Sequence, residues 1–144
     1  MTEAFGSDRA DVALAVSADG VHLGQDDLPV ELARRILNQG KWIGCSTHNL
    51  AQVIEADKSS ADYVAFGPIF PTGSKERPDP VVGLEGLRKA REATRKPLVA
   101  IGGITVENAR ATIEAGADSV AVISDLIGAP DVAARARKFL EALK

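Results

Sequence analysis

Short runs of apolar, often β-branched residues recur along the chain, and each is followed by a stretch with the apolar spacing of a helix. The runs cover residues 20–24, 42–46, 63–67, 97–102 and 119–124. They start about 21 residues apart, with one interval of about 34, and a unit of about 21 residues suits a short strand, two loops and a helix of about ten residues. Uninterrupted apolar runs are typical of parallel strands covered by helices. The pattern therefore predicts five parallel βα units.

The helices between the runs have recognisable start residues, and the widest interval has no helical spacing over residues 68–83, which contain four of the chain's prolines. Further helices are expected before Pro97, up to Gly116 and up to Leu143. The expected start residues are Asp8 or Asp11, Pro29, Asn49, Thr105, Pro130 and Asp131.

Five parallel βα units fit two architectures. One is a doubly wound five-stranded sheet, which is complete at this length. The other is part of a (β/α)8 barrel, which typically needs ~200 residues or more. Length favours the sheet. However, polar residues or glycines directly follow each apolar run, and in a barrel these positions converge on the face that carries active sites.

Composition narrows the function classes. The 144 residues are 45% hydrophobic with a net charge of -3, which indicates one globular domain. Lys and Arg number 17 against 20 Asp and Glu, and aromatics make up 4%, which argues against nucleic-acid binding. Cys45 is the only cysteine, so an internal disulfide is excluded. No apolar run approaches the ~20 residues of a membrane span, and residues 1–11 do not resemble a signal peptide. We expect a cytoplasmic protein without a membrane partner.

Two loops predict a phosphate site. Gly102 and Gly103 follow the fourth run, and Ser124 follows the fifth, with a short helix expected near Leu126. Backbone N–H groups in such loops, together with a helix N-terminus, can hold an anion. A plain tight turn at the two glycines is the alternative, and spacing leaves both open.

The long irregular stretch carries hydroxyls and a cation at Thr72, Ser74 and Lys75. These groups suit a loop that closes over phosphate. An ordinary polar surface loop is the alternative.

Carboxylates and one histidine lie near the first two runs, with Asp8 upstream of both. Asp8 and the pair Asp26 and Asp27 would suit Mg²⁺, which takes a few carboxylates together with phosphate oxygens. Capping of the nearest helices is the alternative role for Asp8 and Asp27. His48, two residues after Ser46, is either an acid/base or a structural imidazole. Cys45 is expected to pack inside its strand.

Six segments match the motifs of one family in order and at that family's spacing. They are residues 18–27 (ADGVHLGQDD), 43–48 (IGCSTH), 61–75 (ADYVAFGPIFPTGSK), 83–87 (GLEGL), 100–104 (AIGGI) and 115–124 (AGADSVAVIS). On these segments the chain, from about Asp8 onward, resembles the thiamine-phosphate synthase family, which is related to a thiazole tautomerase branch. The resemblance implies a (β/α)8 TIM-type barrel, here an incomplete barrel of about five parallel βα units in a single domain over residues 1–144.

The resemblance also implies an activity and the residues that carry it. Family members are transferases that join hydroxymethylpyrimidine diphosphate to thiazole phosphate, giving thiamine phosphate and pyrophosphate with Mg²⁺. Asp8 and Asp27 would be the Mg²⁺ ligands, and Ser46 and Lys75 would contact the pyrimidine diphosphate. The residues implied for the thiazole phosphate are Thr72, Ser74, Gly103, Ile123 and Ser124. The metal and Lys75 would stabilise the departing pyrophosphate, so no protein nucleophile is needed.

The chain departs from the family at its amino end. The family barrel begins with about three further βα units, which carry a Gln-x-Arg-x-Lys segment for the pyrimidine diphosphate, and no such segment occurs here. Ser7 stands where the family has Asn, and residues 1–6 lack the apolar character of the family's third strand. We therefore expect the metal and thiazole-phosphate half of the site without the pyrimidine half. Five strands would leave two open edges, which predicts self-association or a missing amino-terminal segment.

Two other functions stay open. One is a thiazole tautomerase that uses His48 as its acid/base. The other is a non-catalytic protein that binds thiazole or thiamine phosphate. The Asp27→Ala and His48→Ala variants separate the two enzymes, because only the synthase depends on the metal.

Overall fold

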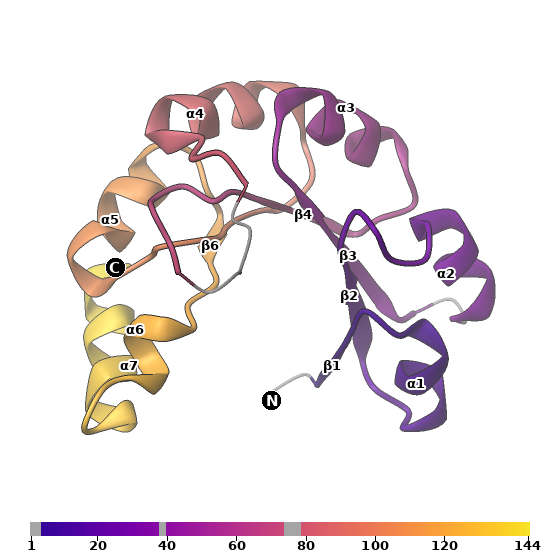
Figure 1. Cartoon of the computed structure of the whole chain (residues 1–144), viewed down its shortest axis with the longest axis horizontal. Helices are drawn as coiled ribbons and strands as arrows, with labels where there is room; N and C mark the ends of the chain where they lie inside the picture. Colours follow the sequence, from indigo (N-terminus) through magenta and orange to yellow (C-terminus); the bar gives the residue numbers. More distant parts are fainter. Residues whose placement is uncertain (1–3, 38–39, 74–78) are drawn as a thin grey trace.

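Six parallel strands form one strongly curved sheet in the order β1-β2-β3-β4-β5-β6 (Figure 1). The structure, a computed structural model, describes residues 4–37, 40–73 and 79–144. The strands are β1 (Phe5–Ser7), β2 (Gly20–Leu23), β3 (Trp42–Thr47), β4 (Tyr63–Phe66), β5 (Leu98–Ala100) and β6 (Ser119–Val120). Within these described ranges β1 and β6 each pair on one side only, so the sheet is an arc of a barrel and does not close.

The helices lie along the convex side of this arc (Figure 1). They are α1 (Ala10–Ala15), α2 (Val30–Ile36), α3 (Leu50–Lys58), α4 (Gly83–Ala93), α5 (Val106–Glu114), α6 (Ser124–Ile127) and α7 (Val132–Ala142). A doubly wound sheet would carry helices on both faces, so that alternative is wrong. The incomplete TIM-type barrel is confirmed, with six strands in place of about five.

The two faces of the sheet differ in burial because side chains alternate along each strand. Leu23, Cys45, Val64 and Leu98 are partners in register across four strands, and all are buried against the helices. Cys45 thus packs inside its strand as expected. The alternate row runs through Ser7, His22, Gly44 and Tyr63 and faces the concave side. The core therefore lies between sheet and helices, and the concave face carries polar and aromatic side chains.

β1, the first of the six strands, is the one that the sequence pattern did not predict. Residues 1–6 were not expected to form a strand, yet Phe5–Ser7 pairs with β2, with Phe5 opposite Gly20. The backbone of β1 forms its hydrogen bonds with β2. Helix α1 packs closely on β1 because Gly6 has no side chain, and a Cβ there would lie 2.9 Å from Cβ of Ala13. Pairing and close packing thus replace an apolar run.

Most of the expected helix ends are confirmed. Asn49 accepts a hydrogen bond from Gln52 N at 3.0 Å, Thr105 forms a capping box with Asn108, and Asp131 caps α7. The start of the first helix is different. The residue before α1 is Arg9, and no side chain caps this helix. Asp11 pairs with Arg9, and Asp8 adopts a left-handed backbone (φ 66°) just after β1, so the capping expected of these two aspartates is wrong.

One hydrogen-bonding arrangement of an aspartate repeats at the amino ends of the strands. Asp19, Asp62 and Asp118 each follow an alanine just before β2, β4 and β6. Each carboxylate accepts a backbone N–H within one residue of the start of the preceding strand, from Ala4 (2.9 Å), Ile43 (2.6 Å) and Leu98 (2.8 Å) respectively. Two of the three also bind an arginine from the helix before that strand: Arg34 with Asp62 at 2.5 Å and Arg91 with Asp118 at 2.7 Å. Within the described residues, Asp19 has no such arginine.

This difference predicts unequal costs for the same substitution. The Asp62→Ala variant removes the bond from Ile43 and the partner of Arg34, and should lower the free energy of unfolding by about 2–3 kcal/mol. The Asp19→Ala variant removes one bond, from Ala4, and should cost about 1 kcal/mol. Urea unfolding of both variants measures the two costs, and equal losses would contradict the role given to Arg34.

Candidate functional site

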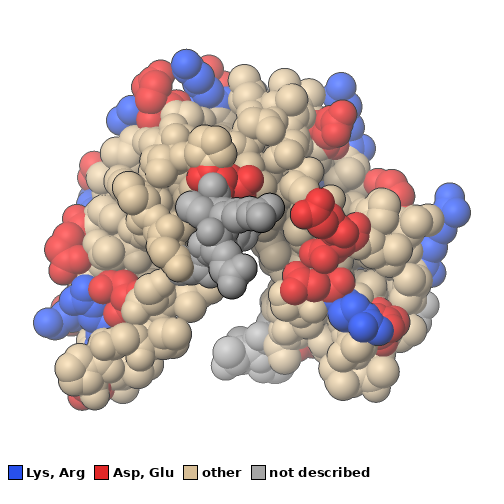
Figure 2. All heavy atoms as spheres, viewed as in Figure 1, with Lys and Arg blue, Asp and Glu red and all other residues tan. Residues whose placement is uncertain are grey.

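The described residues that the sequence analysis singled out lie at the carboxyl ends of the strands. Asp8 follows β1, Asp27 lies in the loop after β2, and Ser46 lies near the end of β3. Figure 2 shows acidic side chains gathered on the viewed face, over the loops that follow β1 and β2. Ser74 and Lys75 lie outside the described residues. The carboxylates and Ser46 thus share one edge of the sheet, as a barrel site requires.

His22 joins these groups, and the sequence analysis did not select it. β2 places its ring on the concave face, where Nε2 lies 2.8 Å from Ser46 Oγ and Nδ1 lies 2.9 Å from the Tyr63 hydroxyl. The ring also stacks on Tyr63, with centroids 5.6 Å apart. Gln25 donates to the Ser46 carbonyl oxygen at 2.6 Å, so β2 and its loop hold Ser46 at two points. The available signal was alternation: His22 is a polar residue inside an apolar run and therefore faces away from the core.

Asp8 and Asp27 act on the same imidazole. Burial lowers the pKa of His22, and the negative charges of Asp8 and Asp27 oppose this. Asp27 accepts the Gly24 N–H at 2.5 Å through one carboxylate oxygen. It does not cap α2, which follows Pro29 without a side-chain cap. The capping alternative for Asp27 is therefore wrong as well.

The two carboxylates fit a divalent cation that is completed by substrate. Mg²⁺ usually binds one or two protein carboxylates together with water and phosphate oxygens. Asp8 and Asp27 supply such a pair from adjacent strand ends. Within the described ranges no group of three or more His, Cys, Asp or Glu side chains could enclose a metal. Asp8 and Asp27 are therefore the carboxylates that would hold a Mg²⁺ here, and the metal itself stays a prediction.

The expected phosphate loops come from neighbouring strands. Gly102 and Gly103 both have positive φ (86° and 67°), so the tight turn is present. A Cβ on Gly103 would lie 2.6 Å from the Pro71 carbonyl oxygen, which shows that this turn packs against the segment leading to Thr72. Thr72 is half-buried there.

The loop after β6 is tied to the start of α5. Ser124 is the first residue of α6 and follows the exposed Ile123. The next residue, Asp125, accepts the Val106 N–H at 3.1 Å and pairs with Arg135 at 2.6 Å. The residues implied for thiazole phosphate that the structure describes therefore come from three consecutive loops.

His48 lies between two loops. Its Nδ1 is 2.6 Å from the Gly67 carbonyl oxygen and 3.6 Å from Oδ2 of Asp79. These contacts tie the end of β3 to both ends of the segment between β4 and α4. They give His48 a structural role, and its acid/base role stays a prediction.

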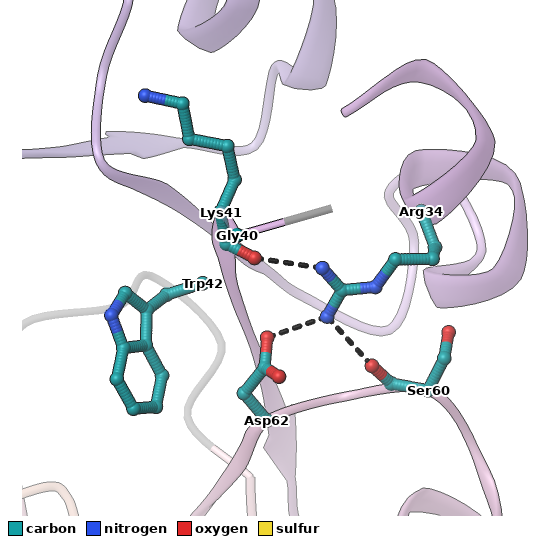
Figure 3. Close-up of a pocket in the computed structure, with 6 residues that line it drawn as sticks. All are labelled: Arg34, Gly40, Lys41, Trp42, Ser60 and Asp62. Carbon is teal, nitrogen blue, oxygen red and sulfur yellow. Dashed lines mark hydrogen bonds and ion pairs between the residues drawn. The ribbon is translucent and has the colours of Figure 1, made fainter. Parts of the chain in front are cut away.

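A cavity of about 510 Å³ lies at the opposite end of the sheet (Figure 3). Arg34 lines it and donates hydrogen bonds to the carbonyl oxygens of Lys41 (2.7 Å) and Ser60 (2.8 Å) and to Asp62. Figure 3 shows these hydrogen bonds, which connect α2 to the starts of β3 and β4. The cavity is therefore part of the aspartate arrangement at the amino ends of the strands and not of the candidate site.

Tyr63 provides an optical report on this site because it is the only tyrosine of the chain. Burial raises its pKa to about 12. In the unfolded chain this phenol ionises near the ordinary value of ~10. The free energy of folding that comes from burying the neutral phenol is therefore complete below that pH and is lost as the pH rises toward 12. Ultraviolet absorbance of tyrosinate should give a midpoint about two units higher in folded than in denaturant-unfolded protein. Equal midpoints would show that the ring is not held in the site.

Comparison with known proteins identifies the family. Residues 3–126 match the family model described as thiamine monophosphate synthase. The thiamine-phosphate synthase of Koribacter versatilis is 57% identical over 137 residues, 95% of this chain and 64% of that protein. The chain belongs to the thiamine monophosphate synthase family. The Chloroflexus aurantiacus thiamine-phosphate synthase is 51% identical over 92% of this chain and 61% of its own length.

A solved structure agrees with this membership of the thiamine monophosphate synthase family. The thiamine phosphate pyrophosphorylase from Pyrococcus furiosus superposes with a TM-score of 0.88 at 45% identity, over 96% of this chain and 66% of that one. The present chain spans about three fifths of the length of its curated relatives. Among the described residues, no helix has the length and apolarity needed to cross a membrane.

Proposed function

We propose that this chain carries the metal-binding and phosphate-binding half of a thiamine-phosphate synthase. The reaction joins hydroxymethylpyrimidine diphosphate to thiazole phosphate and gives thiamine phosphate and pyrophosphate. The observation that carries the proposal is the gathering of Asp8, Asp27 and Ser46 around His22, at the carboxyl ends of adjacent strands. Relatives that share about half of its residues are thiamine-phosphate synthases, which supports the same reaction.

The diphosphate would lie against Asp8, Asp27 and Ser46. A bound Mg²⁺, held by the two aspartates, would supply positive charge to the leaving diphosphate oxygens. The Ser46 hydroxyl would donate a hydrogen bond to one of these oxygens. The bond between the pyrimidine methylene carbon and oxygen breaks, and its electron pair leaves with the diphosphate. Lys75 would add a second positive charge, and this role remains a prediction from the resemblance.

The thiazole phosphate would be held by the loops after β4, β5 and β6. Backbone N–H groups at Gly103 and Ser124 are suited to phosphate oxygens, and the Thr72 hydroxyl lies on the loop that packs against Gly103. Holding the phosphate keeps the thiazole nitrogen close to the methylene carbon, where its lone pair forms the new carbon–nitrogen bond. Ser74 and Ile123 complete the set as predictions from the resemblance.

Thiamine phosphate formation by the 144-residue chain tests the proposal. Both substrates and Mg²⁺ are supplied, and the product is read as fluorescence after oxidation to thiochrome. Product that disappears when the metal is chelated supports the synthase. Without product, binding of thiazole phosphate by calorimetry decides whether the phosphate loops work alone, and absence of binding would overturn the proposal.

We also propose that the chain associates with a further sheet, either in a second copy or in an additional segment. β1 and β6 expose unpaired edges within the described ranges, and the concave face shows Phe5 and Trp42 with 42% of each residue exposed. Light scattering of the purified chain should give a mass above that of one copy. A monodisperse monomer would contradict self-association.

A further inference from the structure

Three side chains from three adjacent strands form a continuous hydrogen-bonded line. Tyr63 on β4, His22 on β2 and Ser46 on β3 are joined through the two ring nitrogens of His22, at 2.9 and 2.8 Å. In the described part of the chain, the Tyr63 and Ser46 hydroxyls have no other side-chain or backbone partner. The imidazole therefore decides how the two hydroxyl protons are oriented.

The protonation states restrict the possible directions. An imidazole ring always carries at least one N–H, so at least one of the two hydroxyls must accept a hydrogen bond from it. Burial raises the pKa of Tyr63 to about 12, so the phenol keeps its proton. A neutral ring between two hydroxyls must accept from one and donate to the other, and a charged ring donates to both.

The chemistry of the two hydroxyls selects the direction. A phenol, with an ordinary pKa near ~10, is a much stronger acid than an aliphatic alcohol. It is therefore the better donor to the imidazole lone pair. Tyr63 then donates to Nδ1, and the Nε2 proton is donated to Ser46 Oγ. The Ser46 proton is left over and points away from the ring, toward the open side of the site.

We propose that His22 is a positioning residue that keeps Ser46 as a hydrogen-bond donor toward an anionic diphosphate ligand. The proposal rests on the proposed function for the identity of the ligand, and on the Tyr63–His22–Ser46 line for the proton direction. With the opposite direction Ser46 would turn its lone pairs toward the anion, which would be repelled.

The line is built into the sheet and does not depend on loops. A Cβ on Gly44 would fall inside the Tyr63 ring, so the glycine of β3 is what admits the ring beside His22. Phe5 of β1 packs edge-on against the same ring, with centroids 6.2 Å apart. Four neighbouring strands thus determine where Tyr63 lies, and through it the state of His22.

Nitrogen NMR of the full chain tests the direction without any activity. The chain has only two histidines, so ¹⁵N-histidine labelling and the His48→Gln variant assign His22. We expect the Nε2–H tautomer for His22 in the wild type and loss of this preference in Tyr63→Phe. The Phe5→Leu variant alters packing on Tyr63 but no hydrogen bond, and should keep the tautomer. An Nδ1–H tautomer in the wild type would overturn the proposal.

Calorimetric binding of inorganic pyrophosphate in the presence of Mg²⁺ tests the consequence. Ser46→Ala and His22→Phe should each weaken binding about tenfold, and the double variant should be no weaker than Ser46→Ala alone. If the loss of affinity in the double variant equals the product of the two single losses, His22 acts on the ligand independently of Ser46, which overturns the positioning role. Tyr63→Phe gives a second measurement if His22→Phe does not fold. A wild type that binds no pyrophosphate would overturn the proposed function, while the NMR result would still decide the proton direction.

Discussion

Replacing Asp27 by asparagine is expected to lower thiamine phosphate formation by about 100-fold or more, with the fold intact. An asparagine side chain keeps an oxygen that can accept the Gly24 N–H, so the local turn survives. What is lost is one of two negative charges near His22, and with it a proposed ligand for the cation. The measurement is thiochrome fluorescence as a function of Mg²⁺ concentration, with thermal unfolding as the check on folding.

The neighbouring aspartate gives a matched control. Asp26 has the same side chain one position earlier, is exposed, and is outside the group that acts on His22. Asp26→Asn should therefore leave both the rate and the Mg²⁺ dependence near wild type. Equal losses in Asp26→Asn and Asp27→Asn would reduce the effect to surface charge and remove Asp27 from the metal site.

Adding one methyl group at Gly44 should cost about 3 kcal/mol of unfolding free energy. The new Cβ would occupy the space of the Tyr63 ring, and a strand backbone paired on both sides cannot move away. The displaced ring would also lose the hydrogen bond to His22. Urea unfolding measures the cost, and ultraviolet titration should show the tyrosine pKa falling back toward ~10.

Two variants make the Gly44 prediction specific. Gly73→Ala adds the same methyl group where no atom of the described residues lies within 4 Å, and it should be close to neutral. Tyr63→Val removes the ring, so in that background Gly44→Ala should cost less than about 1 kcal/mol. An undiminished cost without the ring would show that Tyr63 is not what requires the glycine.

Local sequence signals predicted the parts of the fold that they physically determine. The outward residues of β2 to β5 are apolar because they meet helices, and their spacing located those strands correctly. Asn49 and Asp131 cap helices through bonds to residues three positions away, which a short motif can record. β1 has no such local record, because its pairing with β2 and the approach of Ala13 to Gly6 are set by distant parts of the chain.

The candidate site was predictable to the extent that it follows strand ends. Asp27 and Ser46 were found from their positions at the ends of apolar runs, and Asp8 as a further carboxylate upstream. The structure brings all three to one edge. His22 and Tyr63 were missed because they lie inside such runs, where the pattern of the buried face dominates. Their partnership joins positions 41 residues apart and depends on a glycine in a third strand. Spacing along the chain does not contain that information.

The aspartates before β2, β4 and β6 have a consequence for dividing the chain. Each one holds the strand before it, so a break between β4 and α4 separates no aspartate from its strand. Asp62 stays with Ile43 and Arg34, and Asp118 stays with Leu98 and Arg91. Two fragments cut at this point would each keep the aspartate bonds of their own strands, while the bonds from Lys96 to Ala56, Ser59 and Ala61 would form again when the fragments rejoin. They would rejoin through the β4–β5 edge, which makes this position the place to split the gene for fragment complementation.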